Sequence, residues 1–305
     1  MNSTNPVIDE YVSALRTETR DLTSTSLMIR LAQEIDALTD READATRLPP
    51  PAAKYIESVA RKSNAHLAGA CAKLLVLHLI DNSDARLEKF AIPDSVRLLY
   101  PDAYRRIARN LALVRNEIYV ATGGDFERDL RLVSQISIPV SKSRYIDRNA
   151  YLNHHFYRYQ GKFLNLKHLA FLAFKLHGLG PLFRIHVDER DLTDFNDAGC
   201  SQAYLHIAEL LHLYPSIKGA VATSWLLDPQ LNKISPNLTY SRRLFEAHGA
   251  IFRNDGPETH EQNLEHALKK SVKRRRMFEN GEYIPTCFTV VWARRDLLRW
   301  ANTPL

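Results

Sequence analysis

The sequence predicts a mixed α/β protein, in which a helical N-terminal half precedes a mixed sheet with helices on at least one face. Two observations predict this class. Apolar residues recur at helical spacing through residues 1–133, and strand-like and helix-like segments alternate through residues 134–305. With 305 residues, 45% of them hydrophobic, the chain is long enough to bury one large core or two moderate ones. We therefore expect a helical region over residues 1–133 and a mixed α/β domain over residues 134–305.

Helices are predicted in the first half wherever leucine, isoleucine and valine return every three or four residues. The clearest amphipathic stripe covers residues 104–118, and Gly123 and Gly124 end it. Three prolines at residues 49–51 end an earlier helix and act as a stiff connector. The predicted helices of this half are residues 27–38, 55–80, 104–118 and 126–133.

The apolar period changes near Ile136, where Ile138 and Val140 alternate with Ser137 and Pro139. This alternation predicts a strand, and the proline indicates that it lies at an edge of the sheet. Further on, strands and helices of ordinary length follow one another, which indicates a sheet covered by helices. The predicted strands are residues 136–140, 182–187, 217–226, 250–253 and 283–292. The predicted helices are residues 163–176, 198–214, 241–248, 259–279 and 294–301.

Composition favours a cytoplasmic protein without a membrane span. No apolar run approaches the roughly 18 residues that cross a bilayer, and the first residues lack the basic and apolar regions of a signal peptide. Cys71, Cys200 and Cys287 are few, odd in number and far apart, which argues against a disulfide framework or a zinc–thiolate site. His206 and His212 share one side of a helix with a glutamate, but the spacing does not match His-Glu-x-x-His, so we expect no metal.

The most informative segment is residues 223–231, Thr-Ser-Trp-Leu-Leu-Asp-Pro-Gln-Leu. Ser224 and Asp228 stand at or just past the carboxyl end of a predicted strand, where open α/β sheets bind ligands. Two structural explanations stay open beside this one. Asp228 followed by Pro229 is also typical of a helix start, and Trp225 is either a core residue or a stacking platform.

Residues 185–187 (Ile-His-Val), a following helix and the segment at residues 223–231 together resemble the C-terminal domain of GNAT-like acyltransferases. That family carries a strand with His-Ile-Pro and then Cys-His-Ser-Trp-Leu-Leu-Asp-Pro-x-Leu. The resemblance covers residues 182–255, about a quarter of the chain. Val187 replaces the family's proline, Ala222 and Thr223 replace its Cys-His pair, and no glycine-rich run that would cradle coenzyme A is present. The resemblance implies a GNAT-like fold and transfer of an acyl group from acyl-coenzyme A, or another acyl thioester, to an amine.

Site residues follow from this hypothesis. His186 would act as general base, with Ser224 or Asp228 orienting it or receiving its proton, in a pocket where the two halves meet. The alternative for His186 is a buried imidazole with satisfied hydrogen bonds. Arg242 and Arg243, together with Trp225, would bind the cofactor, since paired guanidiniums grip phosphate or carboxylate; equally, the arginines could begin a solvated helix.

A basic cluster between residues 269 and 276 supports a different hypothesis, that of a non-catalytic protein that binds nucleic acid. The alternative is a solvated helix face balanced by Glu258, Glu261 and Glu265, on which His260 and His266 are also exposed. The pair His154-His155 lies in an aromatic and basic link that either stacks bases or packs the halves together. The six basic residues of the cluster are Lys269, Lys270, Lys273, Arg274, Arg275 and Arg276.

Three functions therefore remain open: an acyltransferase acting on a small-molecule substrate, a nucleic-acid-binding protein, and a scaffold that keeps the fold without the chemistry. The absence of the family's Cys-His pair motivates the third. No Gly-x-Ser-x-Gly elbow, Walker loop or dinucleotide fingerprint is present, which argues against hydrolases, P-loop proteins and Rossmann enzymes.

Overall fold

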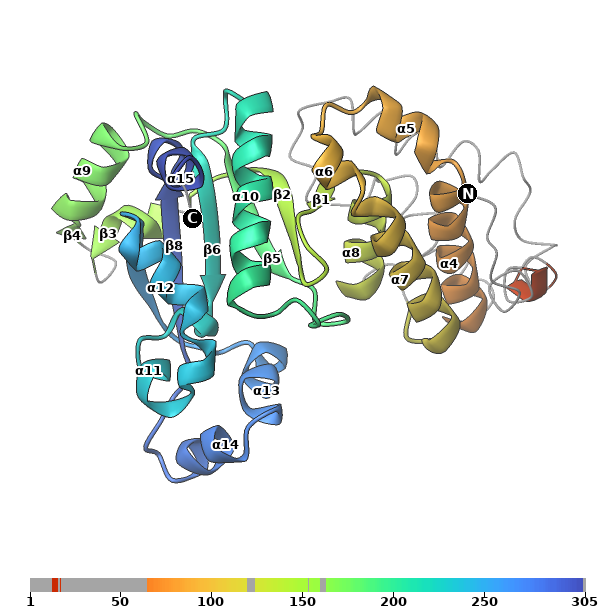
Figure 1. Ribbon diagram of the computed structural model, residues 1–305. Helices are drawn as coiled ribbons and strands as arrows, with labels where there is room; N and C mark the ends of the chain where they lie inside the picture. The colour runs from red at the N-terminus through yellow and green to blue at the C-terminus, as the bar shows by residue number, and fades with distance from the viewer. Residues whose placement is uncertain are drawn as a thin grey trace. The chain divides into compact units, whose positions relative to one another are not determined.

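The computed structural model describes residues 13–15, 17, 65–119, 124–152, 154–159 and 163–303 (Figure 1). The chain divides into two compact units, Met1–Pro139 and Val140–Leu305. The predicted helix at residues 27–38, the prolines at 49–51, Gly123 and the start of the helix at 55–80 lie outside the described residues. Within the described part, no helix combines the length and the apolar character needed to span a bilayer.

The described part of the first unit is helical apart from one short strand. Helix α7 (Tyr100–Leu113) ends at a buried lysine of α4 (Ala65–Asp81), because Lys73 donates from Nζ to the carbonyl of Val114 at 2.5 Å. Gly69 of α4 then allows close approach of the next turn, since a β-carbon there would lie 1.8 Å from the Asn116 carbonyl oxygen. The helix predicted over residues 104–118 therefore ends earlier, at Leu113, and the prediction that it reaches residue 118 was wrong. The elements are α4 (Ala65–Asp81), α5 (Ser83–Lys89), α6 (Asp94–Arg97), α7 (Tyr100–Leu113), α8 (Gly124–Val133) and β1 (Ser137–Pro139).

The second unit is the mixed α/β structure that the sequence predicted, with helices on both faces of a twisted sheet (Figure 1). Its strands are β2 (Arg144–Ala150), β3 (Arg158–Tyr159), β4 (Phe163–Leu164), β5 (Leu182–Val187), β6 (Gly219–Ser224), β7 (Ile251–Pro257) and β8 (Thr286–Ala293). Its helices are η1 (His154–Tyr157), α9 (Leu166–Phe174), α10 (Asp197–Leu213), η2 (Trp225–Leu227), α11 (Leu231–Ile234), η3 (Pro236–Leu238), α12 (Tyr240–Ala247), α13 (Glu261–Lys269), α14 (Val272–Glu279) and α15 (Arg294–Ala301).

Five strands of this unit lie side by side in one sheet, in the order β2-β5-β6-β8-β7. Only β5 and β6 run parallel, and the other neighbours are antiparallel. The β2 strand was not predicted, because its sequence is mostly polar and Ile146 is its single large apolar residue. Such a strand is recognisable only from its pairing with β5, which runs from Arg144 opposite Val187 to Ala150 opposite Leu182.

Each face of the sheet packs on a separate core. On the first, the α9 face, Phe171 of α9 packs with Leu182, Val221, Ile251 and Val291 of the strands. Trp292 lies on the opposite side, the α10 face, fully buried among aromatic rings. Those rings are Tyr204 of α10, Phe245 of α12 and Trp300 of α15, with centroids 5.4–5.7 Å from the Trp292 ring.

A capping side chain explains why two of the predicted elements of this unit were too long. The strand predicted to residue 226 ends at Ser224, whose Oγ accepts the Leu226 N–H at 3.1 Å and starts the 3₁₀ turn η2. The helix predicted over residues 259–279 is two helices, because the Oγ of Ser271 accepts the Arg274 N–H at 3.2 Å and begins α14.

The β5 and β6 strands separate as they run toward their carboxyl ends. They pair at Phe183 opposite Ala220 and at Arg184 opposite Val221. Beyond these positions β5 continues beside β2 as far as Val187, and β6 continues beside β8 as far as Ser224. A split therefore opens inside the sheet between two strands that are each held from the other side.

Candidate functional site

A cavity of about 700 Å³ lies at this split, and every residue that lines it belongs to the second unit. The carboxyl-terminal residues of both parallel strands form part of its wall, and residues of α10, α12, α13, η2 and the loop after β5 form much of the rest. This is the position where open α/β sheets bind ligands. The strand residues in the wall are Ile185, His186, Val187, Ala222, Thr223 and Ser224.

His186 is held by a carboxylate that the sequence did not indicate. Its Nε2 lies 2.9 Å from Oδ2 of Asp147 on β2, and its ring stacks on Tyr145 at a centroid distance of 4.9 Å. When Nε2 carries the proton and donates it to Asp147, Nδ1 is left as a hydrogen-bond acceptor. The His186 side chain is 34% exposed, so the imidazole is both oriented and accessible.

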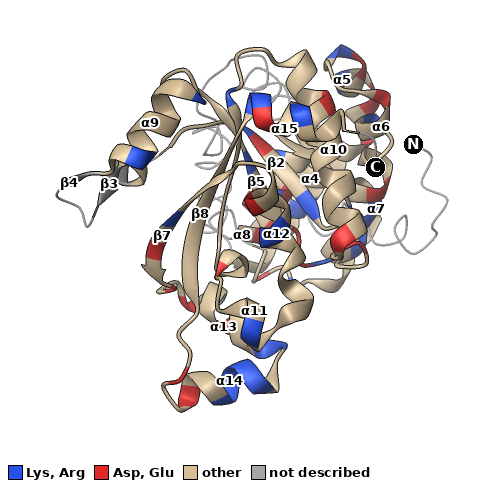
Figure 2. Ribbon diagram, turned by 60° about the vertical axis from the view of Figure 1, so that its left-hand side comes forward, with Lys and Arg blue, Asp and Glu red and all other residues tan. Residues whose placement is uncertain are grey.

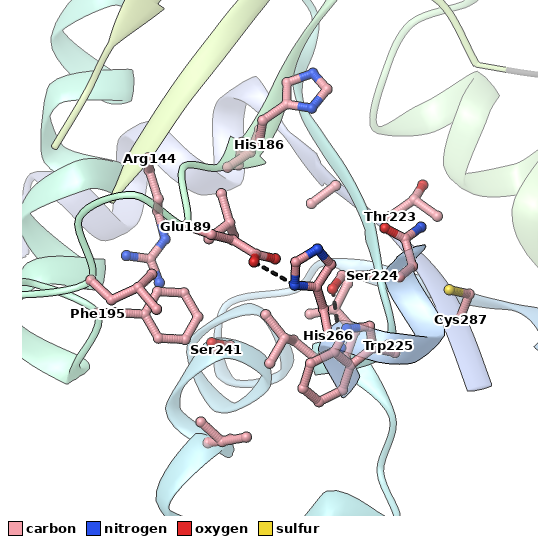
Figure 3. Close-up of a pocket in the computed structure, with 18 of the residues that line it drawn as sticks. Arg144, His186, Glu189, Phe195, Thr223, Ser224, Trp225, Ser241, His266 and Cys287 are labelled. Atoms are coloured by element: carbon pink, nitrogen blue, oxygen red, sulfur yellow. Dashed lines mark hydrogen bonds and ion pairs between the residues drawn. The ribbon is translucent and has the colours of Figure 1, made fainter. Parts of the chain in front are cut away.

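His186 and Ser224 point to opposite faces of the sheet. Because Arg184 pairs with Val221, His186 and Thr223 two residues further on share the α9 face, whereas Ser224 lies on the α10 face. In Figure 3 the His186 ring accordingly points away from the residues grouped around Ser224. The Ser224 hydroxyl therefore does not orient His186; it lines the cavity and caps η2.

Asp228 is a structural acceptor in this fold and does not line the cavity. It is 2% exposed, and its carboxylate accepts the backbone N–H of Gln230 at 2.9 Å and of Thr286 at 3.3 Å. Burial raises the pKa of this carboxyl above its usual range. The structure does not bring Asp228 to His186; Asp147 stands where the sequence hypothesis placed Asp228.

The paired arginines are engaged elsewhere and do not line the cavity. Arg242 donates to the carbonyl of Leu227 and lies over the ring of Phe252, 4.2 Å from its centroid. Arg243 is exposed and pairs with Asp197 at 3.2 Å. Of the three residues predicted to hold the cofactor, Trp225 is the one in the cavity wall.

The basic cluster is divided between the inside and the outside of the protein. Arg274 is 5% exposed, lies 5.3 Å from the Trp225 ring, and donates to the carbonyl of Ala267 and the hydroxyl of Ser235. Burial lowers its pKa. Lys269 and Lys270 line the cavity, and Figure 2 shows the remaining positive charge along α14. The cluster is therefore not one continuous solvated face, and nucleic-acid binding stays a prediction that rests on Lys273, Arg275 and Arg276.

Two further pairs in the cavity were missed by sequence reasoning. His266, which was expected on an exposed polar face, pairs with Glu189 through Nδ1 and Oε2 at 2.6 Å, as Figure 3 shows. The Cys287 thiol donates to Glu258 at 2.8 Å, and burial followed by this hydrogen bond raises its pKa to about 12. One signal was available: Glu189 is the second residue after the carboxyl end of a correctly predicted strand.

The other histidines singled out by the sequence do not form a site. His206 is buried and bonds the Val140 carbonyl at 2.7 Å and the Gln202 side chain at 3.0 Å, which accounts for both ring nitrogens. In the part of the chain that the structure describes, no three acidic, histidine or cysteine side chains gather as metal ligands do. The His154 and His155 side chains lie outside the described residues.

Comparison with known proteins gave one similar structure. No protein-family model matches the chain, and no curated protein matches it significantly. The similar structure is described as an acyltransferase in complex with decanoyl-CoA and teicoplanin. It is 14% identical, with a TM-score of 0.46 over 92% of this chain and 95% of that one.

Proposed function

We propose that this protein transfers an acyl group from acyl-coenzyme A, or a related acyl thioester, to an amine acceptor. The single observation that carries the proposal is the split between β5 and β6, where a cavity of about 700 Å³ meets an oriented imidazole. The GNAT-like resemblance at residues 182–255 agrees with this position, because it includes both strands of the split.

The thioester arm would enter the split from the α10 face. Beyond Arg184 and Val221 the facing backbone groups of β5 and β6 do not pair with each other, so they are free to bond an extended, amide-containing ligand in the manner of an added strand. Lys269 and Lys270 in the wall supply positive charge for the phosphates of a nucleotide cofactor. These lysines would take the place of the glycine-rich cradle that the sequence lacks.

The acceptor would approach from the α9 face, where His186 points. Next to His186 on this face, Thr223 bonds Thr289 at 2.7 Å, and Thr289 donates to Asp255 at 2.6 Å. This row of hydroxyl and carboxylate groups gives an amine polar partners beside the imidazole. The opposite end of the same face is covered by the apolar core around α9.

His186 would act as the general base in the transfer. Its Nδ1 takes the proton of the amine as the amine nitrogen attacks the thioester carbonyl, and Asp147 stabilises the imidazolium that results. The carbon–nitrogen bond forms, the carbon–sulfur bond breaks, and the thiolate leaves with a proton returned from the imidazolium. Backbone N–H groups along the split are suited to stabilise the oxygen that becomes negative.

A direct test measures binding and transfer separately. Calorimetry with acyl-coenzyme A donors of increasing chain length reports binding, and thiol release with mass detection of the acylated product reports transfer to a panel of amines. We expect binding that coenzyme A competes with, and transfer with at least one amine. If no donor binds at millimolar concentration, the proposal is wrong; if donors bind but no amine is acylated, the scaffold hypothesis replaces it.

A further inference from the structure

We propose that Arg144 binds a carboxylate of the substrate in this cavity. The identity of the substrate rests on the proposed function. One of the binding comparisons below, with free carboxylates, is independent of it. Arg144 opens β2 opposite Val187, so its side chain lies on the α10 face of the sheet, the face from which the thioester would enter. Figure 3 shows its guanidinium beside the Phe195 ring, with the Glu189–His266 pair between it and Cys287.

The Arg144 side chain is deeply buried and yet forms part of the cavity wall. The residue is 4% exposed, and its guanidinium carbon lies 4.8 Å from the centroid of the Phe195 ring. Its Nη1 donates to the hydroxyl of the neighbouring Ser143 at 3.1 Å, and the Tyr240 hydroxyl is a second side-chain partner of the guanidinium. A guanidinium has five N–H donors, so most of its capacity to hydrogen-bond is left for a ligand.

No side chain in the described part of the chain neutralises Arg144 at contact distance. No described carboxylate forms an ion pair with it within 4.0 Å. Asp194 acts on it from further away, and that carboxylate already accepts the backbone N–H groups of Lys142 and Ser143 at 2.7 and 2.9 Å. A buried cation without an opposite charge in contact is costly, and a bound anion removes that cost.

The neighbours on α10 and α12 are acids that remain neutral. Burial raises the pKa of the Cys200 thiol and that of the Tyr204 hydroxyl. Burial also raises the pKa of Tyr240, whose hydroxyl donates to the Phe195 carbonyl at 2.8 Å. These groups surround Arg144 with polar atoms but supply no negative charge at neutral pH.

A carboxylate fits this environment better than a phosphate. A planar carboxylate accepts two parallel bonds from the guanidinium fork, and the Phe195 ring and Leu192 offer apolar contact to the carbon chain behind it. The phosphates of coenzyme A have exposed partners in Lys269 and Lys270. The far end of a dicarboxylic acyl chain enters from the same α10 face as Arg144, whereas the carboxylate of an amino-acid acceptor would have to reach Arg144 through the split from the α9 face.

Matched ligand pairs separate these two sources. Glutaryl-coenzyme A is compared with pentanoyl-coenzyme A for the acyl chain, and an amino acid with its amide for the acceptor, by calorimetry on the full chain. We expect the carboxylate member of one pair to bind roughly 10- to 100-fold more tightly, and Arg144→Gln to abolish that preference. Arg144→Lys should retain part of the preference, because lysine keeps the charge without the fork.

The control variant is Arg295→Gln, which removes an exposed arginine of α15 that does not line the cavity. Circular dichroism verifies that each variant is folded. If Arg144→Gln does not fold, the carboxylate preference of Arg144→Lys is used in its place. Equal binding within both pairs by the wild type overturns the proposal. A folded Arg144→Gln or Arg144→Lys variant that keeps the full carboxylate preference also overturns it. The same holds for a variant whose affinity for unacylated coenzyme A falls by the same factor as its affinity for the carboxylate ligand.

Failure of the proposed function gives a different result. If no thioester binds the wild type, the acyltransfer proposal fails, and free glutarate against glutaramide then tests Arg144 alone in the same calorimeter. Tighter binding of glutarate that is lost in Arg144→Gln supports a carboxylate site in a protein of another function. Equal binding of glutarate and glutaramide ends the Arg144 proposal as well.

Discussion

The two ends of the β5–β6 pair are built from the same strands and differ in almost every property. At the paired end Leu182, Phe183, Ala220 and Val221 are almost completely buried and belong to the packing of the unit. At the open end the strands no longer pair and His186 is reachable from solvent. A sheet can therefore give up the hydrogen bonds of its last residues to form a site, because β2 and β8 hold the two separated strands from outside.

The largest expected effect tests whether the open end carries chemistry. Under the proposed function, His186→Gln should reduce kcat by about 10²–10⁴-fold, because it removes the proton acceptor. Asp147→Asn should cause a smaller loss, and the double variant should be no worse than His186→Gln, since the two act as a unit. Single-turnover acylation rates measure this.

The control for this experiment is His212→Gln, which removes an exposed histidine of α10 that does not line the cavity. It should leave the rate unchanged. If the losses of rate add in the double variant, Asp147 does not act through His186 and its role is in packing.

Cys287 extends the comparison, because it lies at the open end and yet is expected to be inert. A thiol with its pKa raised to about 12 carries on the order of 10³-fold less thiolate at pH 8 than an ordinary cysteine. Alkylation by iodoacetamide should be slower than in urea by a similar factor, and it should accelerate as the pH rises toward 12. Glu258→Gln should speed it, because the carboxylate that disfavours the thiolate is gone. Native alkylation as fast as in urea would show that the thiol is not held as described.

Phe183→Ala tests the paired end, where the expected loss is in stability instead of chemistry. Deleting a fully buried aromatic side chain typically costs about 3–5 kcal/mol in the free energy of unfolding. Urea denaturation followed by fluorescence measures this cost. Thioester binding by the fraction that remains folded should change little. A loss of stability under about 1 kcal/mol, or a selective loss of binding, would contradict the division of roles between the ends.

The sequence predicted most of the longer strands and helices of this unit and the edge of the sheet that carries the site, and it did so for local reasons. Leu182–Val187 was predicted with its exact bounds, since apolar alternation and flanking glycines are local signals. The predicted strands also placed His186 and Ser224 near the edge of the sheet where ligands bind. The polar strand β2 has no such signal, so neither Asp147 nor Arg144 was recognised.

The partners of the site residues were not predictable because they meet only in the folded chain. Asp147 reaches His186 across an antiparallel register, and Glu189 reaches His266 from a different element. Conversely, the segment that looked most like a site, residues 223–231, supplies Ser224 and Trp225 to the wall but buries Asp228 under backbone N–H groups. The helix-start explanation of Asp228, left open by the sequence, describes its contacts better.

The smallest expected effect sharpens the comparison at Asp228, just outside the open end. If its role is structural, Asp228→Asn should cost roughly 1–2 kcal/mol of stability, because asparagine can accept from Gln230 or Thr286 but not from both in the same way. The rate of the folded variant should stay within a few-fold of wild type.

Because burial raises the pKa of this carboxyl, the folded state favours its protonated form. The corresponding stability is present below the unfolded pKa of about 4 and is lost as the pH rises through the folded value. The wild type should therefore lose stability relative to Asp228→Asn as the pH rises above about 4, measured by urea midpoints. A selective loss of rate at unchanged stability would return Asp228 to the chemistry.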